Sequence, residues 1–151
     1  MPLVRCSYVP RALACALAFV SLTAAAEPAD HPGVRTLLST DMTVTNEPIR
    51  YPLATPARVT AVEITLQPGE QTGWHAHPVP LIGYILSGEL TVDYGPLGQR
   101  TYRQGEALAE AMDEAHNGRN NGEQPVKILA VFIGAEGVAG TVPAAPPPRR
   151  P

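Results

Sequence analysis

The chain has 151 residues, of which 44% are hydrophobic and 17% charged, a length and composition that predict one globular domain. A formal net charge of -3 gives no electrostatic basis for binding nucleic acid or an anionic membrane surface, so we expect neither partner. Aromatic residues make up 5% of the chain, whereas it has 17 prolines and 13 glycines, which favours short strands and tight turns over a helical bundle.

The first 26 residues are typical of a secretory signal peptide. Arg5 and Arg11 come before an uncharged apolar run over 12–26, which ends in a small-residue cleavage site before Glu27. We therefore expect an exported protein, either periplasmic or secreted. The run is shorter than the roughly 18 to 20 apolar residues of a transmembrane helix, so no membrane span is predicted. The alternatives are a buried N-terminal helix and a lipoprotein anchored through Cys15.

Three further segments follow the predicted signal peptide. We expect a loose stretch over 27–35, a folded domain over 36–138 and a disordered tail over 139–151, where successive prolines can build neither a ladder nor a core. A docking arm for a partner is the alternative for the tail. Both cysteines, Cys6 and Cys15, fall in the signal peptide, so the mature chain would have no disulfide and no thiolate metal ligand.

Short strands and turns make up the expected domain. Residues 59–66 alternate in polarity, with Ile64 and Leu66 on the apolar face. Turn signals separate this segment from further expected strands at 71–77, 81–86, 89–94, 100–103, 107–110 and 126–133. The pattern has no sustained helical period and no internal repeat. The expected fold class is all-β, a sandwich or a barrel.

Histidines carry the clearest chemical signal. His75 and His77 form an H-x-H pair on an expected strand, where alternation places both imidazoles on one face, about 7 Å apart. Two neutral imidazoles at that spacing can converge on one metal ion, although two solvent-facing histidines would give the same pattern. His31 lies in the loose N-terminal stretch, where we expect no role for it.

Two segments around these histidines resemble the sequence motifs of the cupin family. GEQTGWHAHPVPLIGYILSG resembles the first motif, G-x5-H-x-H-x3,4-E-x6-G, which runs here from Gly69 to Gly88. GEALAEAMDEAHNGRN resembles the second, G-x5-P-x-G-x2-H-x3-N, with Gly105, His116 and Asn120 in their motif positions. The resemblance covers about residues 36–138. It implies a single jelly-roll β-barrel, in which we expect Asn120 to play a structural or supporting role in a turn.

The resemblance also implies a metal centre. One divalent transition metal, which could be Fe, Mn, Zn, Ni or Cu, would bind to His75, His77 and His116. The family's glutamate ligand falls at Leu81, or at Pro80 with the shorter spacing, and neither residue can bind a metal. A three-histidine site would therefore keep an additional open coordination position. A barrel that has lost its metal is the alternative.

Gln71 and Glu110 are the candidates for the missing ligand's place, for substrate positioning or for proton transfer. Gln71 shares the strand parity of the H-x-H pair if that strand is regular, and Glu110 comes six residues before His116. The alternatives are a hydrogen bond to loop backbone for Gln71 and a solvent-exposed strand end for Glu110. The second motif's proline and glycine are Ala111 and Asp113 here, so Asp113 is expected to need a positive φ.

Strand parity predicts the two faces of the barrel wall. Leu81, Gly83 and Ile85 should face the histidines and line an apolar pocket. The opposite face should carry Trp74, Ala76, Ile82, Tyr84 and Leu86. An apolar outer face is unusual for a lone soluble barrel, so we expect a homodimer; the alternative is that the N-terminal segment covers this face.

The leading functional hypothesis is a metal-dependent enzyme that acts on a small oxygenated molecule, as a dioxygenase or an isomerase would. The resemblance implies this activity, with Glu110 or Gln71 as catalytic group. The alternative is a binding protein that captures a small anionic or phenolic ligand, because the sequence offers no pair of catalytic carboxylates and no nucleophile with a base. In a third interpretation the metal only stabilises the fold.

Overall fold

The computed structural model describes residues 33–53 and 56–148, and contacts group residues 35–151 into one compact unit. The expected signal peptide, with both cysteines, and His31 lie outside the described residues. Regular structure in the described part consists of nine strands and one short 3-10 helix, Gly95–Leu97. No helix within these ranges is long and apolar enough to cross a membrane.

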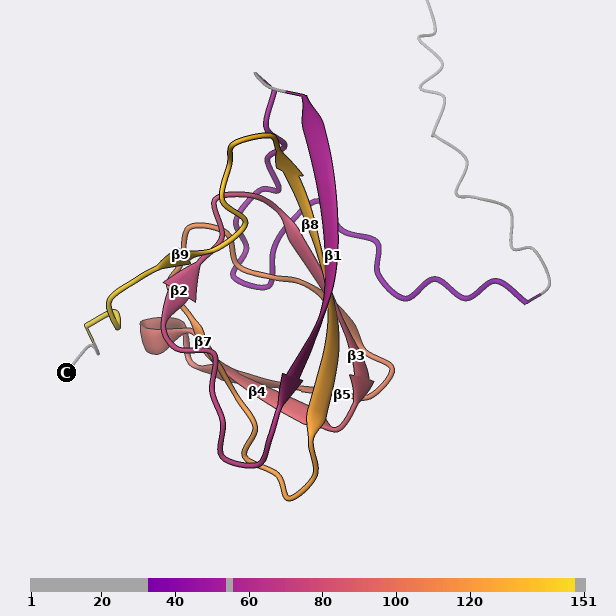
Figure 1. Cartoon of the computed structure of the whole chain (residues 1–151), viewed down its shortest axis with the longest axis vertical. Helices are drawn as coiled ribbons and strands as arrows, with labels where there is room; N and C mark the ends of the chain where they lie inside the picture. Colours follow the sequence, from indigo (N-terminus) through magenta and orange to yellow (C-terminus); the bar gives the residue numbers. More distant parts are fainter. Residues whose placement is uncertain (1–32, 54–55, 149–151) are drawn as a thin grey trace, which may run out of the picture. The chain divides into compact units, whose positions relative to one another are not determined.

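The strands form three antiparallel sheets (Figure 1). The largest has the order β1 (Ala57–Leu66), β8 (Val126–Ala135), β3 (Leu81–Ser87) and β6 (Ala107–Ala109). The second has the order β5 (Gln99–Arg103), β4 (Glu89–Asp93) and β7 (Asn117–Arg119), and the third pairs β2 (His75–Ala76) with β9 (Val142–Pro143). Strands distant in the chain, such as β1 and β8, are neighbours in space, as in a jelly roll. The expected all-β jelly-roll fold is confirmed.

The hydrophobic core joins the two larger sheets. On β1 and β8, the cross-strand pairs Ile64–Ile128 and Leu66–Val126 turn their side chains inward, as the alternation of β1 predicts. Leu90 of β4 belongs to the same buried cluster. The remaining buried members are Ile85, Val92, Tyr94, Leu108 and Ala111. Apolar side chains from both sheets thus form one core.

A glycine separates β3 from β4. Gly88 has φ +79°, a left-handed conformation that costs other residues strain. A Cβ atom at this position would also lie 2.9 Å from the carbonyl oxygen of Pro125. The predicted break between these two strands therefore depends on the absence of a side chain at Gly88.

The expected strand over 71–77 is largely irregular. Only His75 and Ala76 form a strand, together with an isolated bridge between Gln71 and Arg119. Gly73 adopts φ +78°, which turns the backbone out of the extended conformation. Side chains before this glycine therefore do not keep the parity of the histidines after it.

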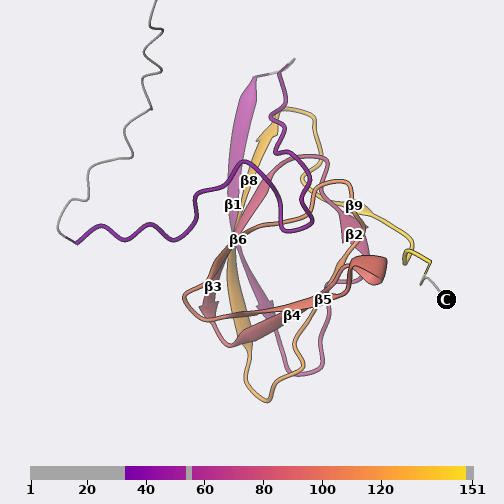
Figure 2. The same ribbon diagram turned by 180° about the vertical axis from the view of Figure 1, so that it is seen from behind.

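Residues 139–148, called the C-terminal strap below, have a defined course, contrary to the disorder expected of them. β9 pairs with β2, so that Pro143 lies opposite His75 and Val142 opposite Ala76 (Figures 1 and 2). The next amide, that of Ala144, donates to the carbonyl of Trp74 at 3.1 Å. Proline lacks a donor but not an acceptor, so a short edge strand tolerates it. The strap therefore joins the barrel next to the predicted metal ligands.

Candidate metal centre

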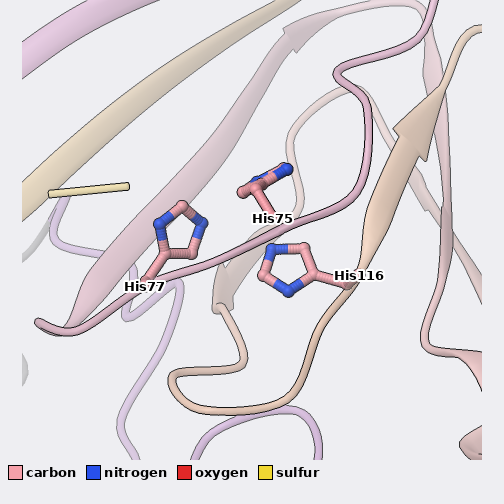
Figure 3. Close-up of side chains that lie close together, drawn as sticks. All are labelled: His75, His77 and His116. Carbon is pink, nitrogen blue, oxygen red and sulfur yellow. The ribbon is translucent and has the colours of Figure 1, made fainter. Parts of the chain in front are cut away.

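The three histidines of the two motifs meet in one place. His75 lies in β2, His77 follows it and His116 directly precedes β7 (Figure 3). His75 and His116 exchange two backbone hydrogen bonds of 3.0 and 2.9 Å, which fix the two segments side by side. The ring centroids are 4.5 to 5.0 Å apart, and one potential ligand nitrogen from each ring lies within 4.8 Å of the others.

Backbone carbonyls select the tautomer of each ring. The Nδ1 atoms of His75, His77 and His116 lie 2.8, 2.8 and 2.9 Å from the carbonyl oxygens of Gly73, Gly140 and Glu114. Because a carbonyl oxygen only accepts, each Nδ1 carries the proton and each Nε2 keeps a free lone pair.

Burial gives further reason to consider a metal. His116 Nε2 is buried and has no hydrogen-bond partner among the described residues. An orphaned buried nitrogen of this kind needs an explanation, and a metal ion supplies one. The three side chains thus fit a divalent transition metal bound through three imidazole Nε2 atoms.

Desolvation keeps these imidazoles neutral. Burial lowers the pKa of all three histidines, and it lowers that of His77 to about 3. His77 and His116 expose only 3% and 2% of their surface. A neutral imidazole is the form that binds metals, so no proton has to be displaced at neutral pH.

Glu110 lies beside the position that the missing glutamate would occupy. Its backbone amide donates to the carbonyl of Leu81 at 2.9 Å, so Glu110, which directly follows β6, lies next to Leu81. The carboxylate is buried and lines the same cavity as the histidines, but it is not in the group whose ligand atoms lie within 4.8 Å of one another. The exposed strand end considered as an alternative for Glu110 is therefore excluded.

Hydrogen bonds hold the Glu110 carboxylate in place. Its Oε1 accepts from the Tyr94 hydroxyl at 2.7 Å and from the Ala111 amide at 2.8 Å. The Tyr94 hydroxyl also lies 3.1 Å from that of Tyr102. Burial raises the pKa of Glu110, and the hydrogen bond from Tyr94 opposes that change. The motif spacing gives no indication of Tyr94, because its hydroxyl reaches Glu110 across the core.

Gln71 lies away from the cavity. The residue is exposed, and its Oε1 accepts a hydrogen bond from Asn117 Nδ2 at 2.9 Å. It does not line the cavity that holds the histidines. The irregular backbone at Gly73 separates it from them, since the parity argument required a regular strand.

A cavity of about 500 Å³ adjoins the three histidines. Leu81 and Gly83 line it as predicted, whereas Ile85 is buried in the core instead. Trp74 also lines the cavity, so its predicted outward orientation is wrong. Two strap residues, Thr141 and Pro143, complete one wall.

The loop that leads to His116 is tied to the N-terminal segment. Glu47 accepts hydrogen bonds from the backbone amides of Met112 and Asp113, both at 2.9 Å, and from Thr45 Oγ1 at 2.6 Å. Burial raises the pKa of Glu47, but the hydrogen bonds from Thr45 and the loop outweigh it, so the pKa lies below its usual range. Nothing in the sequence indicates this role.

Two further expectations concern the second motif. Asn46 is the one non-glycine residue with positive φ in the described part, so Asp113 does not adopt the conformation expected of it. Asn120 is buried and structural, as expected. Its Nδ2 donates to the carbonyls of Leu66 and Gln124, and its Oδ1 accepts from the Gly122 amide.

Comparisons with known proteins agree with this architecture. Residues 62–132 match the family model described as Cupin domain. A DMSP lyase from Ruegeria pomeroyi is 23% identical, with a TM-score of 0.51 over 58% of this chain and 44% of the lyase. An uncharacterized conserved protein with a double-stranded beta-helix domain, from Klebsiella pneumoniae, is 20% identical, with a TM-score of 0.51 over 71% of this chain and 99% of its own.

An S161A mutant of oxalate decarboxylase from Bacillus subtilis is 26% identical, with a TM-score of 0.46 over 56% of this chain and 23% of that enzyme. The chain thus spans less than half the length of the lyase and of the decarboxylase. The comparison with curated proteins finds no match. At 23% and 20% identity, the similarity to the lyase and to the Klebsiella pneumoniae protein shows the fold alone and identifies no substrate.

Proposed function

Because the chain belongs to the cupin family, we propose that it is a metal-dependent enzyme that acts on a small oxygenated molecule, as a dioxygenase or isomerase would. The observation that carries the proposal is the arrangement of three imidazoles, two buried and that of His75 half-buried, each with Nδ1 held by a carbonyl and Nε2 free. A divalent ion bound there would polarise a substrate oxygen. Iron, manganese, zinc, nickel and copper all suit the donor set.

Glu110 supplies the proton-transfer group in this proposal. Its carboxylate lines the cavity, and its Oε1 is held by two hydrogen bonds, so the side chain is fixed before a substrate binds. A carboxylate with a raised pKa is a better base near neutral pH than an exposed one. The location of Glu110 therefore supports an enzyme. Gln71, which is outside the cavity, is given no part in the reaction.

A binding protein remains the second candidate function. The observation in its favour is that Glu110 is the only Asp or Glu among the residues that line the cavity, so no second carboxylate could act as the acid or base partner of Glu110. Turnover distinguishes the two, since a binding protein would return its ligand unchanged.

The test of the proposed function starts with metal content. The chain is produced without a histidine tag and its metals are measured by elemental mass spectrometry. About one equivalent of a transition metal is expected. His77→Ala and His116→Ala should lose it while the circular dichroism spectrum of the barrel persists, and His31→Ala serves as the matched control. Unchanged metal content in His77→Ala would contradict the three-histidine assignment.

We also propose that the chain is exported, on the grounds of its N-terminal sequence. Cell fractionation and N-terminal sequencing test this: a mature chain that begins at Glu27 is expected, and an uncleaved cytoplasmic chain would contradict it.

A homodimer is proposed through the outer face of the large sheet, because apolar side chains lie next to one another there. Val131 pairs with Ile82 and Leu129 with Tyr84, and these side chains are half-buried or exposed. A second copy of the chain would remove this apolar surface from water. Sedimentation of wild type and Leu129→Glu tests the proposal, and a monomeric wild type would refute it.

A further inference from the structure

The cavity beside the histidines has a polar end and an apolar body. The polar groups are the three imidazoles, the Glu110 carboxylate and the hydroxyls of Thr72 and Thr141. The rest of the lining is apolar and comes from strands of both large sheets, including Ile64, Leu90, Leu108 and Ala130. No lysine or arginine is among the residues that line it.

The separation of polar and apolar side chains in the cavity limits which ligands can bind. A hydroxyl or carboxylate placed against the apolar body would lose its hydrogen bonds to water without finding protein partners. If the ligand carried a negative charge on its body as well as at the end that meets the histidines, that second charge would find no cationic side chain in the cavity wall. Apolar surface, in contrast, gains from leaving water.

Volume gives the second constraint. About 500 Å³ lies within the usual range for pockets that bind small molecules. A two-carbon acid would leave most of that space to water in contact with apolar walls. A ligand with a body the size of a substituted aromatic ring fills it better.

We infer that the cavity takes a molecule with one oxygen-bearing end, directed to the histidines, and an apolar aromatic or branched aliphatic body, and that it rejects sugars and small polyacids. The inference rests on the proposed function only for the direction of the oxygen. The apolar body is recognised by the barrel walls whether or not a metal is bound.

Ala130 provides the variant that tests the body of the cavity. It lies on β8 opposite Gly83 of β3, is 1% exposed and lines the cavity. Ala130→Phe therefore adds a ring to the space that the ligand would fill. Thr101 of β5 is exposed, does not line the cavity and lies on the other sheet from the proposed dimer face, so Thr101→Phe is the control.

Trp74 provides the signal. It is the only tryptophan of the chain and lines the cavity, so its fluorescence reports binding directly. The probes are phenol, 4-propylphenol and gluconate, titrated into the protein with and without reconstituted metal, with excitation at the red edge of tryptophan absorption. Metal content is measured separately on every sample.

Saturable binding of 4-propylphenol is expected, roughly 60-fold tighter than that of phenol, because each of the three buried propyl carbons contributes about a fourfold gain. Gluconate should not compete. Ala130→Phe should weaken binding of 4-propylphenol at least about tenfold with its metal content unchanged, because its ring would take the place of buried ligand surface, and Thr101→Phe should bind as wild type does. If Ala130→Phe does not fold, Ala130→Leu gives the same comparison with a smaller side chain.

Tighter binding of gluconate than of 4-propylphenol, or equal affinity for phenol and 4-propylphenol, would overturn the inference. The two proposals fail in different ways. A protein that holds metal but does not distinguish the phenols retains the proposed function and loses the inference. A protein that never holds metal but prefers 4-propylphenol loses the metal-dependent function and retains the apolar ligand class.

Discussion

Substitution of Gly140 should weaken metal binding without touching a ligand. A Cβ atom on Gly140 would lie 2.8 Å from Cδ1 of Phe132, closer than real Cβ contacts allow, and 3.1 Å from its Cγ. Either the strap or the Phe132 ring must then move. The strap holds His77 through a 2.8 Å hydrogen bond from Nδ1 to the Gly140 carbonyl, and the Phe132 ring packs edge-on against His77, with 5.6 Å between centroids.

The size of the effect follows from the role of that hydrogen bond. Loss of a partner that orients a metal-binding histidine typically costs 10- to 100-fold in metal affinity. Gly140→Ala should therefore raise the dissociation constant by about that factor, equivalent to about 1.4 to 2.8 kcal/mol. Competition of a divalent metal between the protein and a chromophoric chelator measures it.

Two controls separate this effect from general destabilisation. At Gly134 on β8 a Cβ atom would find its nearest neighbour, a methyl group of Val79, at 3.6 Å, which is ordinary contact. Gly134→Ala should therefore bind metal as wild type does. Deleting residues 140–151 should reproduce the loss seen in Gly140→Ala, whereas deleting only 149–151 should not. Affinity within twofold of wild type in a folded Gly140→Ala protein would refute the reasoning.

Three further predictions concern stability. Burial lowers the pKa of His77 to about 3, so between that value and the ordinary 6.5 the unfolded chain binds a proton that the folded chain does not. The metal-free protein should therefore lose stability as pH falls from about 6.5 towards 3. In urea titrations, His77→Gln should reduce this loss. Asn120→Ala should destabilise by roughly 1 to 3 kcal/mol, because buried carbonyls lose their donor, and an unchanged urea midpoint would contradict this. Both Gly88 and Gly98 have positive φ, +79° and +89°, but only at Gly88 would a Cβ atom meet close neighbours. Gly88→Ala should therefore lower the melting temperature more than Gly98→Ala. Equal melting temperatures would show that the contact with Pro125 is unimportant.

Local pattern was sufficient to predict much of the fold. Strand parity over β1 and β3 indicated sheet faces, and glycines at the strand ends marked the turns, because both signals depend only on neighbours in the chain. The resemblance of the surrounding segments to the two cupin motifs likewise implied that His75, His77 and His116 would meet.

Prediction failed where the local conformation was irregular. Gly73 adopts a positive φ, and Gln71, which precedes it, lies outside the cavity where regular strand parity placed it. A sequence shows that a glycine is present but not which of its conformations the tertiary contacts select.

The sequence by itself determined the all-β pattern and the H-x-H pair, and its resemblance to the cupin motifs added His116 and the loss of the glutamate at Leu81, because each of these depends on residue type and short spacing. Only the tertiary structure decided that Glu110 enters the cavity beside Leu81, held by Tyr94, and that the proline-rich strap fixes the ring of His77. These contacts join residues 16 to 63 positions apart in the chain. They arise from how the sheets pack, which no local pattern encodes.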